Sequence, residues 1–290
     1  MLAQVSLMPT ESKKLIAKAI ARMDVVKQAA NEGMVVIHPS SSTYFIVEEL
    51  TGGKPKTNVW VCGVVTPKGT CVDMGAMMEE QPSTTTKGPG DFLHSWVIRH
   101  GKVSAGERLS ELLEQMGPRD VYIKGVNALD PQGNVGVLVG NLVEGGTIGL
   151  VISTSKKRAF NLIFPVGLEK LIPVPIAQAT KEAKRASYDY AMGIPTGLFP
   201  CPDGRTVTEL DAIEMLSGAT AIPIAAGGLG GAEGTITLAI KGNEEQVKKA
   251  IEYAEQSKGA RLPQLRLFDC HECPSPMCRF PVGDKHWANV

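Results

Sequence analysis

Three of the six cysteines lie within nine positions near the C-terminus, in the stretch CHECPSPMC at residues 270–278. Two residues separate Cys270 from Cys273, and at this spacing two thiolates from one tight turn can bind the same metal ion. Prolines in the following residues stiffen the return that brings Cys278 to that ion. The spacing therefore predicts a thiolate metal site.

A tetrahedral site needs one more ligand. Cys201 is the first choice because it also lies in a turn rich in proline and glycine, and His271 and His286 are the alternatives. Zinc fits a thiolate-rich ligand set, and an iron–sulfur cluster competes with it although the spacing matches neither ferredoxin pattern. Reduced thiols without an ion, or a disulfide in an oxidising compartment, are the other interpretations.

A second group of candidate residues follows a short apolar stretch. Residues 34–37 predict a strand buried on both faces, and residues 44–50 predict a helix closed by glycine. Four hydroxyl residues separate the two elements: Ser40, Ser41, Ser42 and Thr43. A strand, a polar loop and a helix form the anion-holding unit of open α/β sheets, because free N–H groups and the positive helix end face the ligand. An ordinary helix N-cap, which needs one hydroxyl, is the alternative.

Titratable residues follow a long polar stretch. Residues 79–91 have no periodicity and predict a loop of the kind that often serves as a lid or binding segment. His94 comes next, close to Asp91 and His100, and its imidazole could carry protons at neutral pH. The alternation over residues 92–100 also fits a strand that carries structural or surface histidines.

Composition narrows the class of protein. The 290 residues exceed the usual size of a single core and predict two domains. Thirty basic residues balance thirty acidic ones. The chain therefore lacks the net positive charge whose electrostatic field would attract nucleic acid or an anionic membrane. No apolar run approaches the roughly 20 residues of a spanning helix, and the N-terminal apolar stretch is too short for a secretory signal, so we expect a cytoplasmic protein. Cys62 and Cys71 are interpreted as small buried hydrophobes.

The first part of the chain alternates between helical and extended patterns. Helices are expected at residues 11–31, 44–50 and 105–116, and strands at 34–37, 58–65, 121–126, 135–139 and 147–153. This alternation predicts an α/β domain with a mostly parallel open sheet and helices on both faces, spanning residues 1–175.

The second part changes character after residue 175. Residues 176–204 are expected to form a connector that opens with a basic helix up to residue 192. From residue 205 to 268 the pattern reads strand, helix, strand, strand, helix, strand, which predicts a smaller ferredoxin-like α+β domain, and residues 269–290 form the cysteine-rich tail. Modules of this kind often assemble subunits, so a homo-oligomer is expected. The glycine-rich stretch 226–234 precedes a strand, which favours a hairpin over a dinucleotide loop.

Two stretches carry a family resemblance. Residues 33–50, GMVVIHPSSSTYFIVEEL, resemble the opening strand, hydroxyl loop and helix of the superfamily that groups ribose-phosphate isomerase, glucosamine-phosphate deaminase and the CoA transferases. Residues 122–135, YIKGVNALDPQGNV, are similar to a strand, Asn-Ala-Leu-Asp turn and hairpin in its lactate-utilisation branch and in relatives of unassigned activity. The similarity covers roughly residues 13–171, and its motifs specify a fold better than a reaction.

The resemblance implies roles for individual residues. It implies that Ser40 to Thr43 hold a phosphate or other anionic group of the ligand. It places the turn that contains Lys124, Asn127 and Asp130 at the carboxyl edge of the sheet, beside that ligand. CoA transferases of this group use a glutamate nucleophile, a part that Glu144 could fill, although a solvent-facing hairpin residue explains Glu144 equally well.

Two functions follow from these residues. The first is an enzyme, an isomerase, hydrolase or acyl or CoA transferase, that acts on a small anionic metabolite such as a phosphorylated sugar or a CoA-linked acid. Asp130, Glu144 or His94 would carry out the proton or acyl chemistry. The alternative is a non-catalytic ligand-sensing or assembly protein with a structural metal held by cysteines.

Overall fold

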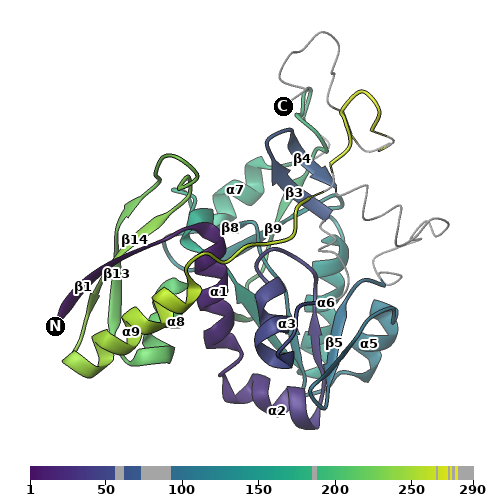
Figure 1. Ribbon diagram of the computed structural model, residues 1–290. Coiled ribbons are helices and arrows are strands. Elements are labelled where there is room, and N and C mark those ends of the chain that lie inside the picture. Colours follow the sequence, from purple (N-terminus) through teal and green to yellow (C-terminus); the bar gives the residue numbers. More distant parts are fainter. Residues whose placement is uncertain are drawn as a thin grey trace.

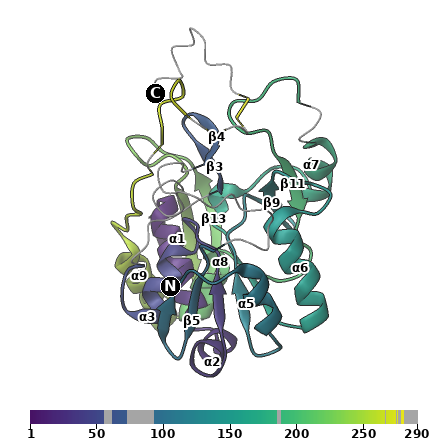
Figure 2. The same ribbon diagram turned by 90° about the vertical axis from the view of Figure 1, so that its right-hand side faces the viewer.

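The computed structural model describes residues 1–55, 62–72, 93–184, 188–265, 267–273, 275 and 278–279. Helices and strands combine in an α/β fold, as the sequence predicts (Figures 1 and 2). Its centre is a six-stranded mixed sheet in the order β12-β10-β7-β2-β5-β6. These strands are β2 (Val35–Ile37), β5 (Trp96–Arg99), β6 (Lys102–Ser104), β7 (Val121–Ile123), β10 (Asn161–Pro165) and β12 (Arg205–Val207). The loop predicted at residues 79–91 lies outside the described residues.

Four neighbouring strands of this sheet run parallel. Ile37 of β2 is in register with Ile123 of β7, which is in register with Ile163 of β10, and β12 continues the parallel order. Strands β5 and β6 are antiparallel to their neighbours. The carboxyl ends of β2, β7, β10 and β12 therefore meet at one edge of the sheet.

The sheet separates two hydrophobic cores, because successive side chains of a strand point to opposite faces. Val35 and Ile37 belong to one core, and Val36 belongs to the other. The first core is covered by helices α1 (Pro9–Ile20), α2 (Asp24–Glu32), α3 (Tyr44–Thr51) and α8 (Glu209–Ser217). The second is covered by α5 (Leu109–Gln115) and α6 (Gly146–Arg158).

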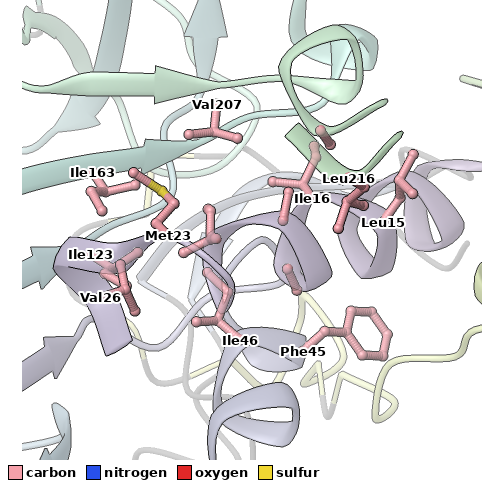
Figure 3. Packing of buried hydrophobic residues seen from close by; sticks show 14 of the residues in the cluster. Leu15, Ile16, Met23, Val26, Phe45, Ile46, Ile123, Ile163, Val207 and Leu216 are labelled. Atoms are coloured by element: carbon pink, nitrogen blue, oxygen red, sulfur yellow. The ribbon is translucent and has the colours of Figure 1, made fainter. Parts of the chain in front are cut away.

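Figure 3 shows how the first core closes over the strands. Met23 and Val26, from the region where α1 gives way to α2, lie against Ile123 and Ile163 of the sheet. Leu15, Ile16 and Phe45 continue the same core toward α8, where Leu216 completes it. The stretch predicted as one helix over residues 11–31 is thus two helices that share one core.

Residues 147–153, predicted as a strand, lie instead in helix α6, so that prediction is wrong. Ile148, Val151, Ile152 and Ser155 are buried at spacings of three and four, the period of a helix with one packed face. The next strand of the sheet is β10, which begins three residues after the helix ends.

A second, three-stranded antiparallel sheet has the order β1-β14-β13 (Figure 1). Its strands are β1 (Leu2–Leu7), β13 (Thr220–Ala226) and β14 (Ile236–Lys241), followed by helix α9 (Glu244–Ser257). The predicted glycine-rich hairpin between β13 and β14 is present, with positive φ at Gly227, Gly230, Gly231 and Gly234.

This sheet differs from the ferredoxin-like domain that the sequence predicts. The first expected strand, β12, belongs to the six-stranded sheet, where it pairs with β10. The last strand was expected at residues 264–268, and the described residues of that stretch, 264–265 and 267–268, form none. The position beside β14 is taken by the N-terminal strand β1, whose Leu7 pairs with Ile236.

The remaining elements lie around the sheet. They are the hairpin β3 (Cys62–Thr66) and β4 (Gly69–Val72), the sheet of β8 (Ala128–Leu129), β9 (Val135–Val139) and β11 (Gly197–Pro200), the short helix η2 (Leu168–Lys170) and helix α7 (Ile176–Glu182). Helix α7 ends ten residues before the predicted end at residue 192. Within the described ranges, no helix combines the length and hydropathy needed to cross a membrane.

Candidate functional site

The loops that follow the parallel strands are held side by side at the carboxyl edge. Backbone hydrogen bonds continue one residue past the strand ends: His38 N–H donates to Ile123 O at 2.9 Å, and Lys124 N–H donates to Ile163 O at 3.1 Å. Beyond β10, Val166 N–H donates to Val207 O at 3.0 Å. His38, Lys124 and the segment 166–170 therefore meet where ligands bind in open α/β sheets.

The hydroxyl loop after β2 is a tight turn. Thr43 is fully buried, and its Oγ1 donates to His38 O at 2.7 Å and lies 3.0 Å from Ser40 Oγ. The N–H groups of Thr43 and Tyr44 both donate to Ser40 O at 3.1 Å. Ser41 is half-buried and Ser42 is buried. The loop lies at the predicted edge, but two of the amides expected to face an anion are used within the turn.

Lys170 joins three of the loops. Its Nζ donates to Ser42 Oγ at 3.0 Å and to Val126 O at 2.7 Å, so a residue that follows β10 contacts the loops after β2 and β7. Burial lowers the pKa of Lys170 to about 8, with help from the positive charge of Lys13. Sequence reasoning missed Lys170, because β10 was not recognised as the strand that precedes it.

Gly125 lets two of these loops approach each other. A Cβ atom at this position would lie 2.7 Å from Ser40 Oγ and 3.2 Å from Ser42 Cβ, closer than side chains normally pack. The loop after β7 therefore rests directly on the hydroxyl loop. The position needs a residue without a side chain.

Two histidines and a lysine lie close together at the same edge. Burial lowers the pKa of His38 well below its usual value, and the charges of Lys124 and His94 lower it further. His38 is therefore a neutral imidazole at pH 7, one that can accept a proton. The predicted residues Lys124 and His94 are brought to this edge, whereas His38 was not singled out from the sequence although it directly follows a buried strand.

A network of buried charges lies behind Lys170. Lys13 Nζ is 2.7 Å from Glu169 Oε1, and both side chains are largely shielded from solvent. Glu209 is 0% exposed and accepts the Leu168 N–H at 2.9 and 3.1 Å through its two oxygens. Burial and the charge of Glu169 raise the pKa of Glu209 to about 7. Glu169 is thus the carboxylate that pairs with a lysine here, and Glu209 is partly protonated at neutral pH.

Asn127 and Asp130, predicted to contact the ligand, hold the chain in place. Asn127 Oδ1 accepts the Leu138 N–H at 3.0 Å across the hairpin. Asp130 is 2% exposed and accepts N–H groups from Gln132, Asn134 and Ile176. Burial raises the pKa of Asp130, but these hydrogen bonds outweigh it and lower the pKa overall. Its oxygens secure a turn and the start of α7.

Glu144, the candidate nucleophile, lies just before α6. Its side chain is exposed, and Oε2 accepts a hydrogen bond from Asn141 Nδ2 at 3.0 Å within the same loop. The main-chain N–H of Glu144 donates to Asn141 Oδ1 at 3.3 Å. These contacts organise the loop itself and match the interpretation of Glu144 as a solvent-facing residue.

Cys201 and the cysteines of the tail differ in burial. Cys201 is 5% exposed within the second core, where burial raises its pKa to about 12 and the charge of Lys124 opposes that rise. Cys270 and Cys273 are half-buried and Cys278 is exposed. Over the part of the chain that is described, no three His, Cys, Asp or Glu side chains are already arranged to hold a metal. His286 lies outside that part.

The carboxyl edge as a whole can bind an anion and move a proton. Lys124 and Lys170 supply positive charge, Ser40 and Ser42 supply hydroxyls, and the neutral His38 can accept a proton. We compared the chain with known proteins: no protein-family model, no curated protein and no solved structure matches it.

Proposed function

We propose that this chain binds a small anionic metabolite, such as a phosphorylated sugar or a CoA-linked acid, at the carboxyl edge of the six-stranded sheet. The ligand would lie between the hydroxyl loop, Lys124 and Lys170. We further propose that the chain is an enzyme of the isomerase or CoA transferase-like kind. The resemblance of residues 33–50 to that superfamily supports this assignment.

The contact geometry of Lys170 is the observation that carries the proposal. Its ammonium lies 3.0 Å from the Ser42 hydroxyl and 2.7 Å from the Val126 carbonyl oxygen, and both of these partners are neutral. An ammonium has three N–H donors, so these partners use two of them. An oxyanion at this position would accept the third and supply negative charge, and such charge-assisted hydrogen bonds are roughly twice as strong as neutral ones.

Proton transfer in the proposed enzyme belongs to His38 with His94 as its neighbour. His38 is buried and neutral, the state that a general base needs before it accepts a proton. Asp130 is an unsuitable base in comparison, because its oxygens already accept the N–H groups of a turn. An imidazole beside a bound anion suits the removal of a proton from a neighbouring carbon atom, as in an isomerase.

The second candidate function, a ligand sensor without catalysis, has its own observation in favour. Both carboxylates predicted to react have structural contacts: Asp130 accepts N–H groups from its own turn and from Ile176, and Glu144 bonds to Asn141 within its own loop. A protein that only binds the anion would need Lys170 and the hydroxyl loop but no base. The two candidates therefore differ in the part assigned to His38.

Calorimetric titration with a pentose phosphate, a hexosamine phosphate, acetyl-CoA and inorganic phosphate tests the binding. Lys170→Met should lower the affinity for the tightest-binding ligand by at least about tenfold, the loss expected when one charge-assisted hydrogen bond is removed. Lys102→Met, at an exposed lysine of β6, is the matched control and should bind like the wild type. Equal affinity in the two variants would refute the proposal.

Turnover of the ligand that binds separates the enzyme from the sensor. His38→Asn should abolish conversion while it retains most of the affinity if the chain is an enzyme. Binding without conversion in the wild type would support the sensor and contradict catalysis.

A further inference from the structure

The hairpin β3–β4 and the C-terminal tail lie side by side, although about 200 positions separate them in the sequence (Figures 1 and 2). Lys68, in the turn of the hairpin, donates through Nζ to Phe268 O at 3.4 Å. The tail therefore reaches the hairpin just before its first cysteine, Cys270.

A short strip at residues 192–194 holds both segments from the other side. Thr70 N–H donates to Met192 O at 3.0 Å, and Ile194 N–H donates to Thr70 O at 2.7 Å. Arg279 N–H donates to Gly193 O at 2.9 Å. The tail is thus attached on both sides of residues 270–278, at Phe268 and at Arg279, and its cysteines lie between these attachments.

Glycines allow the hairpin and the strip to touch backbone to backbone. Gly69 has a φ of 114° and Gly193 has a φ of 94°, values that favour glycine. A Cβ on Gly69 would overlap Met192 O, and one on Gly193 would overlap Thr70 O. The close approach holds β4, and with it Cys71, beside the strip that also binds the tail.

Cys71 lies on β4, next to the residue that bridges to the strip. It is half-buried, and its Sγ lies 3.5 Å from Thr66 Oγ1. Phe268, two residues before Cys270, contacts Lys68 of the same hairpin. Arg279, one residue after Cys278, bonds to Gly193, which lies between the two residues that bond to Thr70. The hairpin and the tail therefore bring their cysteines into one region.

We propose that Cys71, Cys270, Cys273 and Cys278 bind one zinc ion, so that Cys71 and not Cys201 completes the set predicted from the tail. Four thiolates are a standard structural zinc ligand set. In the described part of the chain the thiols are not yet gathered as a ligand set, and the ion draws the tail onto the hairpin. Metal binding then contributes directly to the folding of this region.

Zinc binding at this site exchanges protons for a metal ion. Each coordinating thiol releases its proton to solvent when its sulfur bonds to zinc, so one Zn²⁺ replaces four protons. The resulting centre carries a net charge of about −2. Lys68, whose ammonium contacts the tail at Phe268, supplies positive charge close by.

The test uses the full chain, purified under reducing conditions without chelator. Elemental analysis should find close to one equivalent of zinc, and Cys71→Ser should weaken zinc binding in a competition titration by at least about 10- to 100-fold. Cys201→Ser, which removes the thiol buried in the core, is the matched control and should retain wild-type affinity. Retained affinity in Cys71→Ser, or an equal loss in Cys201→Ser, would overturn the assignment.

Cobalt substitution supplies a second readout, because the spectrum of the wild-type chain alone reports the geometry and the ligands of the site. Co²⁺ bound to the wild type should show the absorption of a tetrahedral thiolate site, and the sulfur-to-cobalt band should weaken in Cys71→Ser. Bound iron with acid-labile sulfide, or a disulfide between Cys71 and a tail cysteine without bound metal, would overturn the zinc centre. Lys170→Met should leave metal binding unchanged. A result against the zinc site can therefore be told apart from a result against the anion site.

Discussion

The ammonium of Lys170 lies 3.0 Å from the hydroxyl oxygen of Ser42, two residues that are 128 positions apart in the chain. The contact forms because parallel strands β2, β7 and β10 deliver their following loops to one edge of the sheet. It combines a positive charge with the hydroxyl loop that the sequence predicts to bind an anion. Anion binding at this edge should therefore depend on the charge state of Lys170.

The affinity for a pentose phosphate or inorganic phosphate should fall as pH rises from 7 to 9. Burial lowers the pKa of Lys170 to about 8, so the ammonium that we propose as the anion ligand is lost over this range. Above that pKa the affinity should drop by up to about tenfold for each pH unit. Isothermal titration at several pH values measures the profile. A flat profile in the wild type, or the same decline in Lys170→Met, would show that another group binds the anion.

Glu209→Gln should stabilise the fold above pH 7. The pKa of Glu209 is about 7 in the folded chain and lies near its ordinary value of 4.5 after unfolding. Between these values the folded chain binds more protons, so stability falls as pH rises from 4.5 to 7. Glutamine does not ionise, so it removes this loss, and its side-chain oxygen can still accept the Leu168 N–H. The free energy of unfolding at pH 8 should therefore rise by on the order of 1–3 kcal/mol.

Urea unfolding at pH 5 and pH 8 measures the effect of Glu209→Gln. The gain should be present at pH 8 and small at pH 5. Glu214→Gln, at an exposed position of the same helix α8, serves as the control and should change stability at neither pH. A loss of stability in Glu209→Gln at pH 8 would mean that its negative charge stabilises the fold.

Gly125→Ala should disturb the hydroxyl loop. The added Cβ would lie 2.7 Å from Ser40 Oγ, so the turn must shift, at a cost of about 1–3 kcal/mol in the free energy of unfolding. Gly117→Ala is the control, because a Cβ there has no neighbour within 4 Å. Thermal unfolding followed by circular dichroism compares the two. Equal melting temperatures would contradict the close contact between the loops.

Asp130→Ala should lower stability, and Glu144→Ala should leave it nearly unchanged. Asp130 holds three N–H groups from a buried position, and loss of its oxygens leaves them without their acceptor, at a cost of about 2–4 kcal/mol. Glu144 is exposed, and its replacement should stay within about 0.5 kcal/mol. Chemical unfolding measures both. A stable Asp130→Ala would return this carboxylate to consideration as a catalytic group.

The sequence predicts those parts of the fold whose signals are local. Strand β2 and helix α3 are recognised because an uninterrupted apolar run and a closing glycine mark them, and Gly52 indeed adopts a φ of 71° at the end of α3. The hydroxyl loop between them is placed correctly for the same reason. The sequence predicted a strand in place of helix α6 because residues 148–152, IGLVI, form an apolar run with three β-branched residues, and a run this short fits either period.

The features that sequence reasoning missed depend on pairings across the chain. Strand β1 pairs with β14 more than 220 residues later, and no local pattern reports that partner. Lys170 lies at this edge because β10 pairs with β7, and the sequence around Lys170 does not indicate that pairing. Cys71 shows the same limitation, because as a lone cysteine in the sequence it gives no sign that the tail lies next to its hairpin.

A crystal structure of the chain with its best-binding anion is the sharpest test of the proposed anion site. An oxygen of the anion should lie within about 3 Å of Lys170 Nζ, with the Ser42 hydroxyl and Lys124 beside it. An anion bound elsewhere on the molecule, with the contacts of Lys170 to Ser42 and Val126 undisturbed, would contradict it.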